Sequence, residues 1–240
     1  MVTREQAFAA ALVELEGALD WELLGDLYCH EGGESFFPPE QREAIREAGL
    51  HFAADLAGEL EADRETGRSL YVGAALAELA PILCETLVLG REVVALNPDT
   101  AEAAELNRGL ASVGASLDLA LPRVEPLPLA QLDAEERGFD HGWLVSVLSD
   151  PDAFPALHLR VYDRGEPEAG ALARDLDAAR ALAADLVARL APGALLTTTD
   201  EELPIVLEVC TAAGRSLDVP DRARLSAVVG DPVRICRLDG

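Results

Sequence analysis

Ser69-Leu-Tyr-Val-Gly-Ala-Ala75 and Arg91-Glu-Val-Val-Ala-Leu-Asn-Pro-Asp99 are the two stretches that decide the fold. Each contains a short, mostly apolar run of the length of a buried strand, and each run ends in turn residues. The segment between them, Leu79 to Leu89, has the spacing of a helix, and Gly90 ends it. The two stretches therefore predict a strand, a helix and a strand, the unit from which parallel sheets are built.

The same alternation continues towards the C-terminus. Asp99 precedes Glu102 by three positions, which is the spacing of a capping box at the start of a helix through Leu110. We expect strands at 117–121, within 139–148, at 194–199 and twice within 225–238 around a turn at 230–232, and helices at 166–190 and 203–213. The pattern predicts an α/β protein with a mostly parallel sheet, to which the closing hairpin adds an antiparallel strand.

The N-terminal part has a different character. Residues 3–27 have the apolar spacing of a helix or a helix pair, residues 30–39 predict a loop, and residues 40–65 predict a second amphipathic helix. We therefore expect an N-terminal helical cap, residues 1–66, and an α/β domain, residues 67–240.

The charge balance narrows the range of partners. The chain has 44 acidic residues against 19 basic ones, a net charge of −25. Such a surface repels phosphate backbones and anionic lipids, so we expect no nucleic-acid partner and no membrane partner. All the basic residues are arginine. The absence of lysine excludes Schiff-base chemistry and a Walker-type phosphate loop.

Cysteine usage and hydropathy predict the compartment. The sequence has four cysteines, and no two of them form a C-x-x-C pair. The first 17 residues lack the continuous apolar run of a signal peptide. No run of about 18 apolar residues is present to span a membrane. We therefore expect a cytoplasmic protein with reduced thiols.

The turn after the first strand indicates an adenosine-type ligand. Small residues from Gly73 to Ala75 let the backbone approach a ligand. Asn97, at the end of the second strand, follows Gly73 by 24 residues, a distance that suits a side chain reaching a ribose. A dinucleotide needs G-x-G-x-x-G, of which only the first glycine is present. S-adenosylmethionine (SAM) has no pyrophosphate, so it tolerates a different turn.

At these positions the sequence resembles the class I SAM-dependent methyltransferases. Residues 70–78 resemble their glycine-rich first motif, residues 93–99 their second strand with its ribose-binding end, and residues 139–148 their fourth strand. Asn107 has the place of an asparagine on the helix that follows. The resemblance implies a Rossmann-like, doubly wound, mostly parallel seven-stranded sheet with an antiparallel C-terminal hairpin. It also implies SAM as the cofactor, bordered by Tyr71, Gly73, Ala75, Glu78, Asn97 and Asp99.

Several positions depart from the family pattern. Tyr71 stands where the family has an acidic residue, and Ala75 and Ala77 replace glycines. Asn97 replaces the carboxylate that binds both ribose hydroxyls. Leu121-Pro-Arg123, at the end of the expected third strand, stands where an aspartate often meets the adenine. A carboxylate accepts two charge-assisted hydrogen bonds where asparagine offers one good acceptor, so these changes weaken SAM binding.

Two side chains are candidates for catalysis. Ser146 lies at the end of the expected fourth strand, at the edge of the sheet where α/β proteins bind ligands. His141, near the same strand and close to where the substrate is expected, is a candidate general base. Methyl transfer from a sulfonium needs mainly positioning, so no conspicuous catalytic residue is required. We expect no metal, because Cys29-His-Glu31 and the pair of His51 and Asp55 do not have a recognised zinc spacing.

The sequence leaves two kinds of function open. The first is SAM-dependent methyl transfer to a small-molecule or protein acceptor. The alternative is a catalytically inactive methyltransferase-fold protein. Such a protein would act as a regulatory or partner subunit through homo-oligomerisation, or would bind another small ligand in the same cleft. A titration with SAM separates the two.

Overall fold

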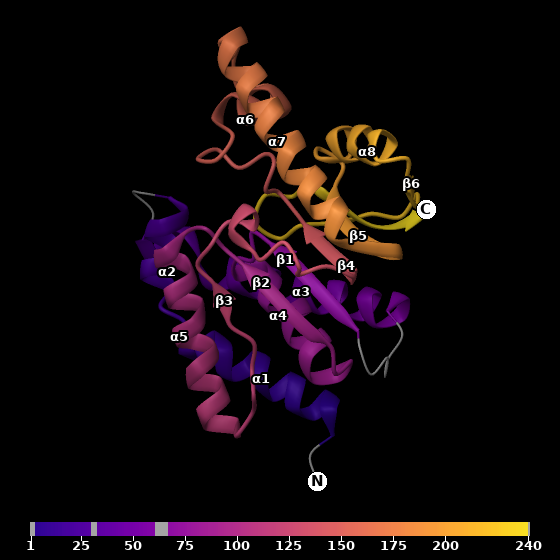
Figure 1. Cartoon of the computed structure of the whole chain (residues 1–240). Coiled ribbons are helices and arrows are strands. Elements are labelled where there is room, and N and C mark those ends of the chain that lie inside the picture. The colour runs from indigo at the N-terminus through magenta and orange to yellow at the C-terminus, as the bar shows by residue number, and fades with distance from the viewer. Residues whose placement is uncertain (1–2, 30–32, 61–66, 240) are drawn as a thin grey trace. The chain divides into compact units, whose positions relative to one another are not determined.

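The computed structural model describes residues 3–29, 33–60 and 67–239 (Figure 1). Parts of the predicted loop at 30–39 and of the predicted helix at 40–65 lie outside these residues. The chain forms two compact units, Met1–Pro128 with Ser226–Val228, and Leu129–Leu225 with Val229–Gly240. The N-terminal helices belong to the same compact unit as the first strands.

Helices open the first unit: α1 (Arg4–Ala18), α2 (Trp21–Tyr28) and, after the short η1 (Gly33–Phe36), α3 (Pro39–Glu59). The predicted helix or helix pair at residues 3–27 is therefore a pair. Thr3 and Gln6 form a capping box at the start of α1, with hydrogen bonds of 3.2 and 2.9 Å. Asp20 begins α2 because its carboxylate accepts the N–H of Leu23 at 3.1 Å.

The strands of the first unit are parallel: β1 (Arg68–Val72), β2 (Glu92–Leu96) and β3 (Val124–Glu125), with β2 between the other two. Val72 is paired with Leu96, so β1 and β2 end at the same edge. The predicted helix between them consists of short pieces, η2 (Leu76–Glu78), α4 (Leu79–Leu83) and the π-helical η3 (Cys84–Val88). Helix α5 (Thr100–Leu117) connects β2 to β3.

The strand expected at residues 117–121 is wrong. Helix α5 continues to Leu117 and ends where Asp118 adopts the left-handed conformation, with φ of 53°. The third strand comes later, at Val124–Glu125, where Asn107 of α5 forms two hydrogen bonds with the backbone of Val124, at 2.7 and 2.9 Å. The alternation of leucine with Asp118 and Ala120 after Ser116 imitated a strand, but the helix continued for two turns beyond Leu110. The end of the third strand is therefore Glu125, not residues 121–123.

The second unit contains β4 (Phe139–Leu144), β5 (Leu190–Thr199), β6 (Ser216–Asp218), β7 (Arg224–Leu225) and β8 (Pro232–Asp239). Its helices are α6 (Pro155–Val161), α7 (Ala169–Arg189) and α8 (Leu203–Ala212), with the short η4 (Leu129–Gln131) before β4. Strands β4 and β5 are parallel, whereas β8 is antiparallel to β5, β6 and β7. The predicted antiparallel C-terminal strands are therefore confirmed, while β6 and α6 were not predicted.

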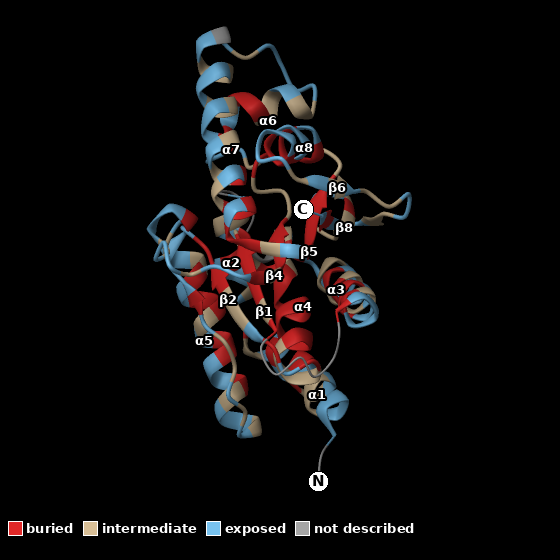
Figure 2. Cartoon of the chain, turned by 45° about the vertical axis from the view of Figure 1, so that its right-hand side comes forward, coloured by how far each residue is buried: buried red, intermediate tan, exposed pale blue. Residues whose placement is uncertain are grey.

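Burial follows the strands and one face of each long helix (Figure 2). In β1 every residue after Arg68 is buried, as expected for a parallel strand covered on both faces. Tyr71, Trp143 and Phe139 are among the largest side chains that are completely buried. Among the helices of the described residues, none is long and apolar enough to cross a membrane.

Candidate functional site

The turn after β1 has the backbone geometry expected of a ligand-binding turn. Gly73 has a φ of 73°, a conformation that favours glycine. The next N–H, that of Ala74, donates to the carbonyl oxygen of Leu96 at 2.8 Å, which fixes the turn to the end of β2. Glu78 accepts the N–H of Ala75 at 3.0 Å and so stabilises the start of η2. Of the predicted cofactor residues, Gly73 and Ala75 thus lie in the turn and Glu78 stabilises it.

Asn97 forms three hydrogen bonds within the protein through its side chain. Its side-chain amide donates to the carbonyl oxygen of Ala74 at 3.0 Å and to Oε2 of Glu102 at 2.7 Å. Its Oδ1 accepts the N–H of Asp99 at 2.8 Å, and only 4% of its surface is exposed. Asn97 therefore connects the turn after β1 to the first turn of α5, and both its amide hydrogens are already used.

Glu102 brings a carboxylate to the end of β2. Its Oε1 accepts a hydrogen bond from the Tyr28 hydroxyl at 2.7 Å, and its Oε2 accepts the one from Asn97. Burial raises the pKa of Glu102, while these two hydrogen bonds act in the opposite direction. The predicted capping box is confirmed only in the half made by Asp99, because the Glu102 side chain points to Tyr28 and Asn97 instead of returning to the helix start.

Tyr28 of helix α2 is the fourth residue in this group of hydrogen-bonded residues. Its hydroxyl oxygen also accepts the N–H of Leu76 at 3.3 Å. Its ring lies 5.2 Å from that of Phe37 and 6.1 Å from that of Phe36. Burial, followed by the negative charge of Glu102, raises the pKa of the Tyr28 hydroxyl, which therefore stays protonated and donates. We call Tyr28, Leu76, Asn97 and Glu102 the hydroxyl cluster.

Asp99 and Tyr71 have other roles. Asp99 is exposed and caps α5, because its Oδ1 accepts the N–H groups of Ala101 at 2.8 Å and of Glu102 at 3.0 Å. Tyr71 is completely buried, and its hydroxyl donates to Oε1 of Glu85 at 2.6 Å. Glu85 in turn forms a buried ion pair with Arg91. In this structure the Asp99 side chain therefore acts as a helix cap, and the Tyr71 hydroxyl belongs to a buried polar group with Glu85.

His141 lies in the middle of β4 and not at its carboxyl end. Its side chain is completely buried, and its Nε2 lies 3.0 Å from the Thr197 hydroxyl of the neighbouring strand β5. A histidine enclosed in this way has no route to an acceptor in solution. The strand continues for three residues beyond His141, so its side chain lies within the sheet.

Ser146 follows β4 and belongs to a polar cluster of the second unit. It has a positive φ of 58°, which is uncommon for a residue with a side chain. Its hydroxyl donates to Oδ2 of Asp231 at 3.2 Å, and the Tyr162 hydroxyl donates to the same oxygen at 2.5 Å. Ser149 lies 3.2 Å from the Tyr162 hydroxyl. The cluster thus contains one carboxylate, only 4% exposed, and three hydroxyls.

Glu202 fixes the loop that carries these serines. Its Oε1 accepts the N–H of Leu148 at 2.8 Å, and its Oε2 accepts the hydroxyls of Thr198 at 3.0 Å and Thr199 at 3.1 Å. The side chain is 1% exposed, and burial raises its pKa. Glu202 therefore connects the loop after β4 to the end of β5 and the start of α8.

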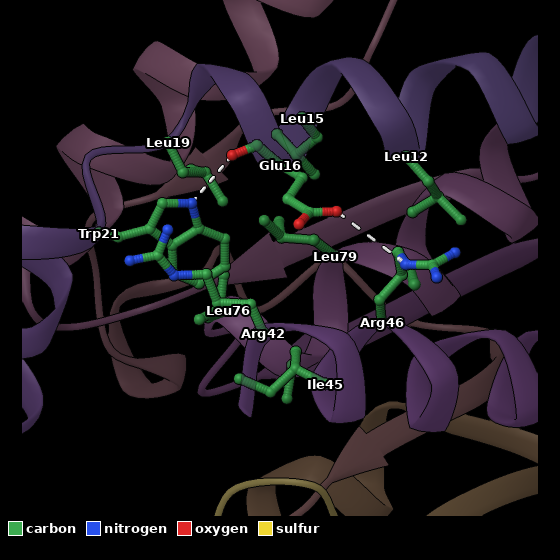
Figure 3. A pocket seen from close by; sticks show the side chains of 12 residues that line it. Leu12, Leu15, Glu16, Leu19, Trp21, Arg42, Ile45, Arg46, Leu76 and Leu79 are labelled. Carbon is green, nitrogen blue, oxygen red and sulfur yellow. Dashed lines mark hydrogen bonds and ion pairs between the residues drawn. The ribbon is translucent and has the colours of Figure 1, made fainter. Parts of the chain in front are cut away.

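A small pocket lies on the side of η2 that faces the N-terminal helices (Figure 3). Leucines of α1, Ile45 of α3 and Leu76 line it, and Trp21 donates from its indole to the carbonyl oxygen of Glu16 at 2.9 Å. The guanidinium of Arg42 lies 4.8 Å from the Trp21 ring centre. The space inside is about 50 Å³, whereas pockets for small organic ligands usually measure about 300–1,000 Å³. It therefore suits a few water molecules and not a nucleoside.

Metal ligation finds no support in the part of the chain that the structure describes. Within it, no group of three or more histidine, cysteine, aspartate or glutamate side chains is arranged to hold an ion. Of the weak candidates in the sequence, His30 and Glu31 lie outside the described residues.

The sequence missed Tyr28 and the function of Glu102 in the cluster. Glu102 was visible only as a capping-box residue, since its spacing from Asp99 explained it completely. Tyr28 lies 48 positions before Leu76, and no periodicity relates them. The one usable signal was Asn97, since an amide in place of a ribose-binding carboxylate suggests that another residue supplies the charge.

Three solved structures are similar to this chain. TYW2 of P. horikoshii, solved in complex with MeSAdo, has a TM-score of 0.50 at 11% identity over 85% of this chain and 64% of that chain. The methyltransferase domain of METTL16 has a TM-score of 0.49 at 14% identity, over 80% and 81%. A precorrin-6y C5,15-methyltransferase of Geobacter metallireducens GS-15 has a TM-score of 0.46 at 14% identity, over 80% of this chain and 86% of that chain.

The chain has the Rossmann-like α/β fold of the class I SAM-dependent methyltransferases. At such low identity the likeness concerns the fold alone, and the chain spans just under two thirds of the TYW2 chain. No protein-family model and no curated protein matches the sequence.

Proposed function

We propose that this protein binds SAM at the carboxyl ends of β1 and β2 and transfers its methyl group to a small-molecule or protein acceptor. The observation that carries the proposal is the carboxylate of Glu102, which Asn97 holds beside the turn after β1 with a hydrogen bond of 2.7 Å. Ligands of open α/β sheets bind at this edge, so a fixed, partly buried carboxylate there has the chemistry for a ribose.

Glu102 supplies the charge that position 97 lacks. The amide hydrogens of Asn97 are used by Ala74 and Glu102, so this side chain has a positioning role. Glu102 already accepts a hydroxyl hydrogen bond, from Tyr28 at 2.7 Å. A carboxylate that accepts the hydroxyl of Tyr28 accepts a ribose hydroxyl in the same charge-assisted way.

The other residues of the turn fit an adenosyl ligand. Gly73 gives the turn its positive φ, and the N–H of Leu76 points to a hydroxyl oxygen instead of a helical carbonyl. SAM supplies an electrophilic methyl group on its sulfonium when it is bound. The chain has to orient the ribose and hold the acceptor, which is a matter of position more than of acid–base chemistry.

The test is a calorimetric titration of SAM and of S-adenosylhomocysteine into the purified protein and into Glu102→Gln. We expect micromolar binding to the wild type and a loss of about 10- to 100-fold in the variant, because glutamine is neutral and turns one donor towards the amide of Asn97. Asp99→Ala is the matched control, since it removes a nearby carboxylate that caps α5. It should leave the affinity unchanged.

A partner subunit that binds no cofactor is the second candidate function, because the hydroxyl cluster is complete without a ligand. The Tyr28 hydroxyl already provides Glu102 with a donor and Leu76 with an acceptor, so the cluster is satisfied without any ligand. A methyltransferase fold that has lost its cofactor and acts as a partner subunit would have this property. Absence of binding up to millimolar concentrations, in the wild type and in Tyr28→Phe, would favour that function and contradict the first.

A further inference from the structure

We infer that Tyr28 occupies the place of a cofactor hydroxyl, so that SAM binds only when helix α2 releases this side chain. The inference rests on the proposed function and concerns the regulation of the same site. The Tyr28 hydroxyl donates to the carboxylate of Glu102 at 2.7 Å and accepts the N–H of Leu76 at 3.3 Å.

This bonding pattern is that of a sugar hydroxyl. A ribose hydroxyl likewise donates one hydrogen bond and accepts others, and an alcohol bridging a carboxylate and a backbone N–H satisfies both groups. Burial and Glu102 raise the pKa of the Tyr28 hydroxyl, so it remains a neutral donor, as an alcohol does. Tyr28 and a ribose hydroxyl therefore compete for the same two partners.

Helix α2 is built so that it can release Tyr28. It has eight residues, of which only Leu24 and Gly25 are buried. A helix of this length has little stability of its own and depends on its contacts. Those contacts include the cap at Asp20, the hydroxyl cluster and the ring of Phe37, whose centre lies 5.2 Å from that of Tyr28. At the other end of the helix, the Trp21 indole donates to the carbonyl oxygen of Glu16 and its ring lies beside the guanidinium of Arg42. Opening of such a short element costs far less than global unfolding.

The arrangement makes affinity depend on a conformational equilibrium. When only a fraction of the molecules has Tyr28 released, the apparent affinity for the cofactor falls by that fraction. Any partner or substrate that holds α2 away from the cluster raises the affinity for SAM without touching the cofactor. Helix α2 therefore regulates the site.

The first experiment measures S-adenosylhomocysteine affinity in matched variants. Tyr28→Phe keeps the ring and removes the hydroxyl, so we expect binding about tenfold tighter than in the wild type. Asp20→Ala removes the cap of α2 at a distance from the site and should also tighten binding. Thr3→Ala removes the equivalent cap of α1, and its affinity should equal that of the wild type.

The second experiment is hydrogen exchange of the wild type with and without S-adenosylhomocysteine. We expect the ligand to accelerate exchange of the amides of α2, Trp21–Tyr28, and to leave those of α1 unchanged. Binding that is equal in the wild type and Tyr28→Phe, with α2 unchanged or protected, would overturn the inference and leave the proposed function intact. Absence of binding to both proteins would overturn the proposed function and the inference with it.

Discussion

The side-chain nitrogen Nδ2 of Asn97 lies 2.7 Å from Oε2 of Glu102 and 3.0 Å from the carbonyl oxygen of Ala74. Both atoms that face this nitrogen are acceptors, so the position requires a donor. Position 97 is where the methyltransferase pattern has an acidic residue. In this protein an acidic residue there would meet a second carboxylate and a carbonyl oxygen, which explains the asparagine in physical terms.

An acidic residue at position 97 should therefore destabilise the folded protein. We expect Asn97→Asp to lower the free energy of unfolding at neutral pH by about 2–4 kcal/mol, because two carboxylates then face each other without a shared donor. Their mutual repulsion raises the carboxyl pKa values in the folded state. The deficit should accordingly shrink as the pH falls and the pair takes up a proton. Urea unfolding at neutral pH and at pH 5 measures both effects.

The double variant Asn97→Asp with Glu102→Gln is the control for that result. In it the carboxylate is at position 97 and the amide at position 102, so one side chain can again donate to the other. We therefore expect the double variant to recover most of the lost free energy of unfolding. Equal stabilities of the single and double variants would show that the contact between residues 97 and 102 does not explain why position 97 is an asparagine.

The buried ion pair of Glu85 and Arg91 should be costly to break. Their side chains are 0% and 2% exposed, and the pair distance is 3.0 Å. Glu85→Gln leaves the guanidinium without its countercharge, so we expect a loss of about 3–5 kcal/mol in urea unfolding. The exposed pair of Arg180 and Glu208, also at 3.0 Å, is the comparison. Arg180→Ala should cost about 1 kcal/mol or less, and equal losses at the two sites would contradict this account of burial.

Glu202 should make stability depend on pH. Burial raises its pKa above the ordinary 4.5, so the folded state binds a proton more tightly than the unfolded state does. Its contribution is therefore most favourable below the ordinary value and is lost as the pH rises from there through the raised pKa. Relative to Glu202→Gln, the wild type should become less stable across that window and then level off. Parallel unfolding curves of the two proteins against pH would refute the assignment.

Asp99 should behave as a helix cap and not as a cofactor ligand. Asp99→Ala should destabilise the protein by about 1 kcal/mol, because two N–H groups at the start of α5 lose their acceptor. Asp99→Ser should restore most of this stability, since serine is also a good cap. Thermal unfolding of the three proteins gives the answer, and an unchanged melting temperature in Asp99→Ala would be inconsistent with the cap.

The parts of the fold that were predictable are those governed by local pattern. The strands before Gly73 and Asn97 and the cap at Asp99 followed from short apolar runs and spacing. The third strand did not, because a two-residue strand has no periodicity and Leu117 to Leu121 imitated one. His141 misled for another reason. Its buried hydrogen bond to Thr197 depends on the pairing of β4 with β5, which sequence spacing does not contain.

The location of the candidate site was predictable from the sequence, but the side chains that form its hydrogen bonds were not. The small residues at Gly73 and the end of the second strand located the edge of the sheet. The hydroxyl cluster depends on Tyr28, which reaches Glu102 across 74 positions of sequence. Contacts of this range are set by how the N-terminal helices pack, and no single-sequence motif encodes them.

The most direct test of the central claim asks whether Glu102 recognises the ribose. S-adenosylhomocysteine and its 2′,3′-dideoxy analogue would be titrated by calorimetry into the wild type and Glu102→Gln. We expect the analogue to bind the wild type at least about tenfold more weakly than the parent compound, and the two compounds to bind the variant about equally, because the hydroxyls then have no carboxylate to bind. The same preference for the parent compound in both proteins, or no preference in the wild type, would contradict the claim.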